Sequence, residues 1–252
     1  MIYQCEETTK VQDLFKNHQS TMIASCIQKV MGKIYVDDLE RPTSAVALLG
    51  DFFFVAGKVN EEMMSLIQQD FIIIIPCELE WETYIEKNYQ KNIKKITRYA
   101  IKKENDIFDI KKLEEIIFHL PSCYQLKLID AAIYHYCQEH SWCRDFVSQY
   151  KDYQTYHELG IGVVILKDNQ PISGASAYSR YQEGIEIEID TLKEYRRQGL
   201  ALICAAKLIL ECLKRHLYPS WDAHNQASVQ LSQKLGYHFD HEYVAYEFYL
   251  FR

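Results

Sequence analysis

The chain has 252 residues, of which 48% are apolar and 25% are charged, and this composition is typical of a globular protein with one or two domains. Its formal net charge is -7 and it shows no basic stripe of the kind that grips a phosphate backbone, so we expect no nucleic-acid partner. An acidic surface favours a cationic partner such as an amine.

Neither the N-terminal segment nor the apolar runs predict export or membrane insertion. Residues 1–20 carry acids and polar groups where a signal peptide has an apolar core, and apolar runs such as Phe71–Pro76 are far shorter than the roughly 20 residues that span a bilayer. The eight cysteines include no CxxC pair, so they fit neither a disulfide framework nor a zinc site, and we expect most of them to be small buried side chains. We therefore expect a cytoplasmic protein with no membrane partner.

The N-terminal half predicts two short helical segments, then a hairpin, a helix, a buried strand, a second helix and a strand. The Gly50-Asp51 joint between two apolar runs indicates the hairpin, and the β-branched run Phe71–Ile75 indicates the buried strand. The predicted elements in chain order are helical segments at Val11–Phe15 and Met22–Met31, strands at Ser44–Leu49 and Phe52–Val55, a helix at Glu61–Gln69, a strand at Phe71–Ile75, a helix at Trp81–Tyr89 and a strand at Ile96–Lys102.

The C-terminal half follows a helix-rich stretch, Glu114–Tyr150, and repeats the order from the hairpin onward. The predicted elements are strands at Ile161–Leu166, Ile172–Tyr178 and Ile185–Thr191, a helix at Leu200–His216, a strand at Pro219–Trp221, a helix at Asn225–Leu235 and a strand at Tyr243–Leu250. The shared order indicates either an internal duplication or a coincidence. We place the boundary within Lys111–Ser122, which gives an N-terminal α/β domain at 1–120 and a C-terminal domain at 121–252.

One segment carries chemistry: the strand Ile185–Thr191, a loop with Arg196, Arg197 and Gly199, and the start of the long helix. A helix start exposes unpaired N–H groups and the positive end of the helix dipole, and both favour an anion. Gly199 would let a phosphate approach the backbone, and the two arginines add donors suited to phosphate oxygens. The pattern predicts a phosphate-binding turn, although the same residues would also serve as a solvated helix cap. It is neither a Walker loop nor a dinucleotide fingerprint.

This segment resembles the GCN5-related N-acetyltransferases (GNAT). Their signature Q/R-x-x-G-x-G/A is met by Arg196-Arg-Gln-Gly199-Leu-Ala201, and it is followed by Trp221-Asp-Ala-His-Asn225, by Ser228 and by Lys234-Leu-Gly-Tyr237. The resemblance covers residues 160–252, and from Thr191 to Tyr237 the chain looks most like the zwittermicin A resistance-type acetyltransferases. It implies an α/β fold, with a mixed, mostly antiparallel central sheet flanked by helices, paired with an N-terminal half. The repeated order of elements makes that half a candidate degenerate GNAT-like repeat.

The resemblance also implies that acetyl-CoA binds here as a co-substrate. Its pyrophosphate would lie on the amides from Arg197 to Ala201, and its pantetheine arm would pair with the end of the strand. The implied cofactor-binding residues are Ile189, Thr191, Arg196, Arg197, Gln198, Gly199, Leu200, Ala201, Asn225 and Ser228. The corresponding N-terminal turn, Ala56–Asn60, lacks the signature, so we expect one acetyl-CoA per chain.

Acetyl transfer to an ammonium needs a base that works near neutral pH. Glu186, Glu188 and Asp190 alternate with isoleucines along the strand, so they share one face, and burial would raise their pKa values. The other interpretation is an acidic face that meets solvent or pairs with cations. We rank Glu188 first and Glu186 second as the catalytic base, and we expect strand amides near Ile189 to stabilise the oxyanion.

The chain departs from the family pattern at the general acid. Many members carry a tyrosine where this chain has Ser232, and serine is a far weaker acid. Tyr237 would be the substitute proton donor, but it would equally well be a core aromatic residue.

We therefore predict an acyltransferase, an N-acetyltransferase that moves an acetyl group from acetyl-CoA to a primary amine of a small molecule by direct attack. The histidines at 224, 238 and 241 lack a completing ligand spacing, so we expect no metal. A protein N-terminus remains open as the acceptor, and the chain would be a monomer or a homodimer. The alternatives are a non-catalytic acyl-CoA-binding or regulatory module and an interaction protein with an acidic docking face.

Overall fold

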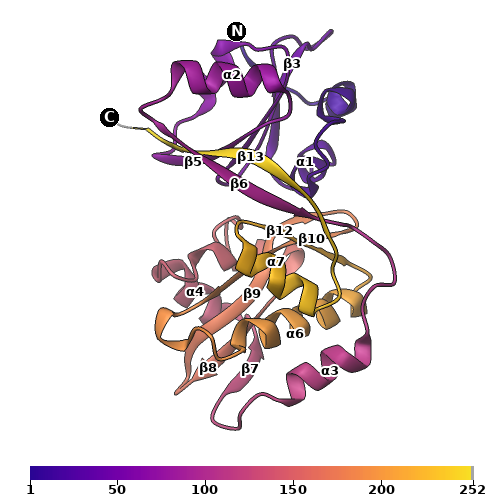
Figure 1. Ribbon diagram of the computed structural model, residues 1–252, viewed down its shortest axis with the longest axis vertical. Coiled ribbons are helices and arrows are strands. Elements are labelled where there is room, and N and C mark those ends of the chain that lie inside the picture. The colour runs from indigo at the N-terminus through magenta and orange to yellow at the C-terminus, as the bar shows by residue number, and fades with distance from the viewer. Residues whose placement is uncertain (251–252) are drawn as a thin grey trace. The chain divides into compact units, whose positions relative to one another are not determined.

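The structure, a computed structural model, describes residues 1–250 and divides into two compact units (Figure 1). The N-terminal unit comprises Met1–Arg98 and the chain from Glu242 onward, and the C-terminal unit comprises Tyr99–His241. The boundary that we predicted near residue 120 falls inside the C-terminal unit. The observed division differs from the predicted one for two reasons. The helix that precedes residue 120 packs against the long helix of the C-terminal unit, and the last strand of the chain pairs in the N-terminal sheet.

The N-terminal unit contains a sheet in which the hairpin, the buried strand and the last strand of the chain are neighbours. Its elements are β1 (Tyr3–Gln4), the 3-10 helix η1 (Thr8–Phe15), α1 (Thr21–Ile27), β2 (Lys33–Val36), β3 (Ser44–Leu49), β4 (Phe52–Gly57), the 3-10 helix η2 (Glu61–Leu66), β5 (Phe71–Pro76), α2 (Leu79–Asn88), β6 (Ile93–Ile101) and β13 (Phe239–Tyr249). The strand order is β1-β2-β3-β4-β5-β13-β6, and the last residues of β6 already belong to the C-terminal unit, where Tyr99 and Ala100 pair with Ala223 and Asp222.

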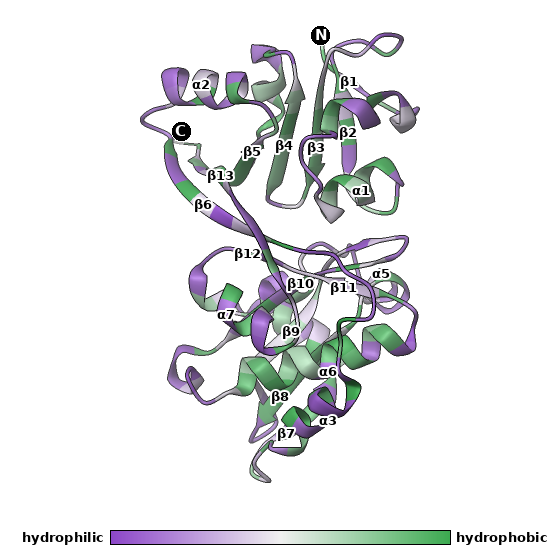
Figure 2. Ribbon diagram, turned by 45° about the vertical axis from the view of Figure 1, so that its right-hand side comes forward, coloured by the Kyte–Doolittle hydropathy of each residue, from purple (hydrophilic) through white to green (hydrophobic). Residues whose placement is uncertain are grey.

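The predicted hairpin and buried strand are confirmed. β3 and β4 pair antiparallel across Gly50-Asp51, and β5 pairs with β4 in parallel. Their apolar side chains pack with Trp81 of α2 and Tyr246 of β13 into a buried core, and Figure 2 shows β4 in the green of apolar residues. The predicted helix at Glu61–Gln69 is instead the shorter 3-10 helix η2, because Ile67 is already extended.

The C-terminal unit contains a second sheet with the order β11-β10-β9-β8-β7. Its elements are α3 (Ile110–Phe118), β7 (Gln125–Leu128), α4 (Ala131–Glu139), the 3-10 helix η3 (Arg144–Phe146), α5 (Tyr153–Leu159), β8 (Gly162–Lys167), β9 (Gln170–Tyr181), β10 (Gly184–Thr191), the 3-10 helix η4 (Lys193–Tyr195), α6 (Leu200–Lys214), β11 (Tyr218–Ser220), β12 (Asp222–Ala223) and α7 (Gln226–Lys234). All five strands predicted in the C-terminal half are present, as β8, β9, β10, β11 and β13, and both predicted helices of the repeat are present as α6 and α7.

Helices cover both faces of this second sheet. On one face, the Ser173 hydroxyl of β9 lies 2.7 Å from Thr191 Oγ1 and 3.8 Å from Cys204 Sγ of α6, which is the largely apolar helix in Figure 2. On the other face, the Ser176 hydroxyl donates to the Phe146 carbonyl of η3 at 2.7 Å. Ser176 lies opposite Glu188 in the β9–β10 register, so Glu188 belongs to the face that η3 covers.

Four strands, β1, β2, β7 and β12, were not predicted from the sequence. All four are two to four residues long, and β7 is mostly exposed at the edge of its sheet. Such strands are too short for an apolar alternation to be recognised in the sequence, and pairing with a neighbouring strand determines them.

The repeated order of elements is confirmed as a repeated topology. In each unit an antiparallel hairpin (β3–β4 or β9–β10) is followed by a helical segment and then by a strand parallel to the second hairpin strand (β5 or β11). Among the cysteines, six are buried, Cys77 is half-buried and Cys123 is exposed, as expected of a chain that uses cysteine mainly for packing.

Within residues 1–250, no helix combines the length and apolar character needed to cross a bilayer. The same part of the chain holds no cluster of three or more His, Cys, Asp or Glu side chains arranged for a metal ion.

Candidate active site

The central feature of the site is a divergence of two parallel strands. β10 pairs with β11 only at Gly184, Ile185 and Glu186, and after Ser220 the chain turns away to form β12, which pairs with β6. The register between β10 and β9 shifts between Glu186 and Ile187, where β9 holds one extra residue. Such a bulge bends a strand and increases its twist, so it coincides with the point where the two parallel strands separate.

Beyond the divergence, β10 exposes backbone groups along one edge. The Glu183 carbonyl accepts from Tyr218 N on the β11 side, and Leu192 N donates to the Ile172 carbonyl on the β9 side. Backbone groups alternate between the two sides of a strand, so the N–H and C=O of Ile187 and Ile189 point toward the edge that β11 leaves. A ligand with amide groups of its own would find a strand edge to pair with there.

A pocket of about 680 Å³ lies beside this edge. It is lined by the end of β10, the turn before α6, the first turn of α6, and the β12–α7 segment. The lining residues are Glu188, Ile189, Asp190, Thr191, Tyr195, Arg196, Arg197, Gly199, Leu200, Ala201, Leu202, Trp221, His224, Asn225, Ala227, Ser228, Gln230, Leu231 and Lys234.

The turn before α6 has the geometry of an anion site. Gly199 is the N-cap with φ of 80°, in the left-handed region, and no side chain caps the helix. The first backbone bond of the helix runs from Ile203 N to the Gly199 carbonyl at 3.2 Å, so the N–H groups of the preceding residues have no acceptor within the helix. A Cβ built on Gly199 would meet nothing within 4 Å, so the space above this turn is open to a ligand.

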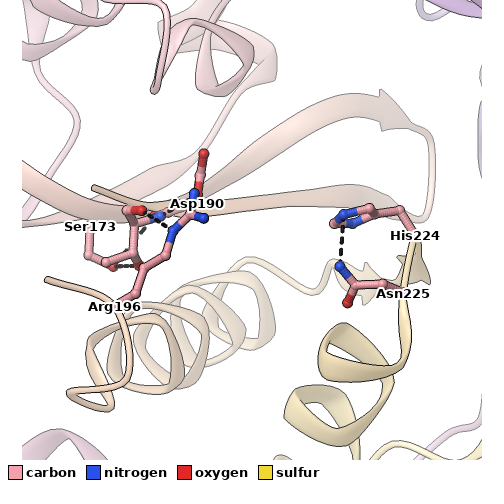
Figure 3. Close-up of polar contacts among 6 residues, drawn as sticks. Ser173, Asp190, Arg196, His224 and Asn225 are labelled. Atoms are coloured by element: carbon pink, nitrogen blue, oxygen red, sulfur yellow. Dashed lines mark hydrogen bonds and ion pairs between the residues drawn. The ribbon is translucent and has the colours of Figure 1, made fainter. Parts of the chain in front are cut away.

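Arg196 joins this turn to the end of β10 (Figure 3). Its Nε donates to the Thr191 carbonyl at 2.9 Å, and its guanidinium Nη2 donates to Asp190 Oδ1 at 3.1 Å. The same Asp190 oxygen accepts the Thr191 N–H at 2.6 Å. Both backbone groups of Thr191 are therefore engaged within the chain itself.

The start of α7 supplies the opposite wall (Figure 3). Asn225 Oδ1 accepts from Ser228 N at 2.9 Å and caps the helix, while Asn225 Nδ2 lies 2.8 Å from His224 Nε2. The Trp221 indole N–H donates to the Ser228 hydroxyl at 3.0 Å. Because Asn225 and Ser228 are each held by a neighbour, the wall is preorganised for a ligand.

The two carboxylates that we ranked as bases lie in different surroundings. Glu188 is half-buried and lines the pocket. Glu186 is only 6% exposed, lies outside the pocket lining, and interacts electrostatically with Lys103. The Lys103 ammonium lies 4.4 Å from the centre of the Tyr181 ring, and burial lowers the pKa of Lys103 while the charges of Glu183 and Glu186 oppose that shift.

The structure does not bring Tyr237 to the pocket. Its hydroxyl donates to the Pro219 carbonyl at 2.6 Å, its ring packs against Phe108 and Trp221, and burial raises its pKa well above the ordinary value. Ser232 is also fully buried, and its hydroxyl donates to the Val229 carbonyl within α7. Neither residue is placed to protonate a leaving group in this pocket.

Of the cofactor-binding residues that we predicted, all except Gln198 line the pocket. Gln198 turns away, and its side-chain oxygen accepts from the Tyr124 hydroxyl at 3.0 Å. Sequence reasoning assigned no role in this site to Trp221, His224 or Tyr195, which also line the pocket, as does Asp190, one of the three acids considered as a base. Trp221 and His224 belong to the stretch that carried the resemblance, so that stretch was the available signal.

Comparison with known proteins identifies the class to which this fold and pocket belong. The family profile of the GNAT acetyltransferases matches residues 12–246, so the chain belongs to the GNAT acetyltransferase family. The α/β GNAT fold, with mostly antiparallel sheets flanked by helices, is thereby confirmed, and the two sheets have a tandem-like arrangement.

Individual relatives support the same assignment. A GCN5-related N-acetyltransferase-like protein from Streptococcus suis 89/1591 has 43% sequence identity and a TM-score of 0.93, with 96% of this chain and 98% of that chain covered. An uncharacterized N-acetyltransferase of Bacillus subtilis (strain 168), YdfB, is 26% identical over 239 residues, or 87% of this chain and 86% of that protein. A tandem GNAT protein from the clavulanic acid biosynthesis pathway shares the fold, with a TM-score of 0.57 at 10% identity and 98% of both chains covered.

Proposed function

We propose that this chain transfers an acetyl group from acetyl-CoA to a primary amine of a small molecule, by direct attack within a ternary complex. The observation that carries the proposal is the meeting, in one pocket, of an uncapped helix start and an open strand edge. The first suits the phosphates of coenzyme A and the second suits the amides of its pantetheine arm.

The residues present fit acetyl-CoA. The N–H groups of Leu200 and Ala201, with the side chain of Arg197, would bind the pyrophosphate, and Gly199 leaves room for it. The backbone of Ile189 would pair with the pantetheine arm, while Asn225 and Ser228 would contact the cofactor from α7.

Acetyl-CoA supplies an activated acyl carbon and a thiolate leaving group whose conjugate acid has a pKa of about 8.5. The chain must therefore bind the amine, remove its proton and stabilise negative charge on the carbonyl oxygen. Glu188 is our proposed base, because it lines the pocket while Glu186 lies outside the lining. Asp190 also lines the pocket, but its carboxylate is held by Arg196 and Thr191 N.

The acceptor is proposed to be a cationic amine, because Glu188 and Asp190 both lie on the pocket and the whole chain is acidic. The resemblance to the zwittermicin A resistance-type acetyltransferases stays a prediction. It makes an amine-bearing antibiotic one acceptor to test beside polyamines, amino sugars and a peptide N-terminus.

Calorimetric titration of acetyl-CoA into the wild-type chain and into Gly199→Trp tests the binding step. We expect one site per chain in the wild type and no binding in Gly199→Trp. The matched control is Val59→Trp, at a 37% exposed residue of a pocket in the N-terminal unit, which should bind as the wild type does.

Release of coenzyme A thiol across a panel of amines then tests catalysis. Release with at least one amine supports the transferase. Acetyl-CoA binding without thiol release from any amine would favour the non-catalytic acyl-CoA-binding module instead. Two binding sites per chain, or none, would contradict the proposed site.

A further inference from the structure

Arg196 is the first residue of the family signature, and its charge alone would make it a ligand for phosphate. Its hydrogen bonds point elsewhere. Nε donates to the Thr191 carbonyl at 2.9 Å and Nη2 donates to Asp190 Oδ1 at 3.1 Å, so two of its donor groups are directed at the end of β10 (Figure 3).

Asp190 completes a closed ring of contacts. Its Oδ1 accepts both from Arg196 and from the Thr191 N–H, the latter at 2.6 Å. An ionised carboxylate at 3.1 Å offsets the guanidinium charge, so the pair presents little net charge to an anion in the pocket. Arg197, by contrast, takes no part in this ring, and it lines the pocket beside Gly199.

The ring closes a short connection between the two parts of the cofactor site. Between Thr191 and Gly199 the chain forms only the 3-10 turn η4, closed by bonds from Tyr195 N to the Leu192 carbonyl and from Arg196 N to the Lys193 carbonyl. One end of this connection is the strand edge and the other is the helix start. A ligand that uses both needs them at a constant separation.

We propose that Arg196 is a positioning residue and not a phosphate ligand: with Asp190 it forms a clasp that holds the open end of β10 against the turn before α6. The clasp sets the spacing between the strand edge and the anion site. This inference rests on the proposed function, since it assumes that acetyl-CoA occupies both.

The clasp and a direct phosphate contact predict opposite effects for one variant. Asp190→Asn removes the carboxylate charge. If Arg196 were a phosphate ligand restrained by Asp190, this change would release its charge and tighten acetyl-CoA binding. With a clasp, Asp190→Asn weakens binding by about threefold and Arg196→Gln by roughly tenfold. The double variant is no weaker than Arg196→Gln alone, because both changes break the same ring.

A ligand without phosphates separates the roles further. S-acetylpantetheine lacks the pyrophosphate and the nucleotide, and its apparent affinity follows from competition against acetyl-CoA. Arg196→Gln should weaken both ligands by a similar factor. The matched control, Arg197→Gln, should weaken acetyl-CoA but leave S-acetylpantetheine unchanged.

Hydrogen exchange at the Thr191 amide in the ligand-free protein gives a readout that needs no cofactor. Asp190→Asn and Arg196→Gln should each accelerate exchange there, while Arg197→Gln should not. Suppose that the wild type binds acetyl-CoA. Unchanged exchange in both Asp190→Asn and Arg196→Gln would then overturn the clasp and leave the proposed function standing, and so would tighter acetyl-CoA binding by Asp190→Asn. Absence of acetyl-CoA binding by the wild type overturns the proposed function, and the role of the clasp in binding with it.

Discussion

The two units share a topology but differ at the strand end where a cofactor would bind. In the C-terminal unit, pairing between β10 and β11 stops at Glu186, and β10 continues to Thr191. In the N-terminal unit, β4 and β5 pair up to Val55, the Val55 carbonyl also accepts from Cys77 N, and β4 ends at Gly57. The C-terminal unit therefore leaves an open edge along the end of β10, whereas the N-terminal unit leaves almost none along β4.

The turns that follow β4 and β10 also differ, because only the N-terminal one is occupied by side chains of the protein itself. Gly57 N donates to the Glu78 carboxylate at 3.0 Å, and the Gly57 carbonyl accepts from the Trp81 indole at 3.0 Å. At the equivalent C-terminal turn, Gly199 faces open space and leads into the 15-residue helix α6, whereas η2 is a 3-10 helix of 6 residues. A repeated topology therefore does not make a repeated site: the N-terminal unit fills its strand end with its own side chains.

The largest difference expected between the two pockets is catalytic. Glu188→Gln should lower kcat by about 10²–10⁴-fold, because the amide cannot accept the proton of the amine. The acetyl-CoA dissociation constant should change little. Glu80→Gln, in the pocket of the N-terminal unit, is the matched control and should leave kcat unchanged. Steady-state thiol release measures both, and equal rates for Glu188→Gln and the wild type would remove Glu188 as the base.

The two glycines should differ in their tolerance of alanine. Both have φ near +80°, at 77° for Gly57 and 80° for Gly199, but a Cβ on Gly57 would collide with the Thr43 carbonyl while one on Gly199 meets nothing within 4 Å. Gly57→Ala should lower the free energy of unfolding by about 3 kcal/mol and Gly199→Ala by about 1 kcal/mol. Urea unfolding followed by circular dichroism tests this ranking. Equal losses would mean that the space above Gly199 is not open.

Tyr237→Phe tests how far the C-terminal pocket extends. Loss of the hydroxyl leaves the buried Pro219 carbonyl without this donor and should cost about 1 kcal/mol of stability. The value of kcat and its pH profile should stay as in the wild type. A kcat reduction of tenfold or more, with the alkaline limb of the profile altered, would restore Tyr237 as a proton donor.

The smallest effect is expected where a carboxylate occupies the N-terminal turn. Burial raises the pKa of Glu78, so this side chain is more easily protonated in the folded chain than in the unfolded one. Its ionisation then costs stability as the pH rises from the unfolded value of about 4.5 through the folded pKa, and the cost persists at neutral pH. Glu78→Gln should therefore melt slightly higher than the wild type at pH 7, with the difference shrinking toward pH 4. A lower melting temperature at pH 7 would show that the charged hydrogen bond to Gly57 N outweighs the burial cost.

Much of the fold follows from local patterns. The apolar runs at β4, β5 and β10, the helical spacing along α6 and the glycine at residue 199 predicted the elements and the anion-binding turn. The short strands β1, β2, β7 and β12 were not predictable, since pairing and not alternation defines them. The domain boundary was also missed, because no local feature shows that β13 pairs with β5 near the other end of the chain.

The sequence by itself indicated the type of site that we propose, since the order Arg196, Gly199, Asn225, Ser228 carried the resemblance to acetyl-CoA-binding enzymes. Only the tertiary structure decided the roles within it. It placed Tyr237 and Ser232 in the core, turned Gln198 toward Tyr124, and engaged Arg196 with Asp190. The physical reason is that residue type decides what a side chain can bind, whereas burial and neighbouring donors and acceptors decide what it does bind.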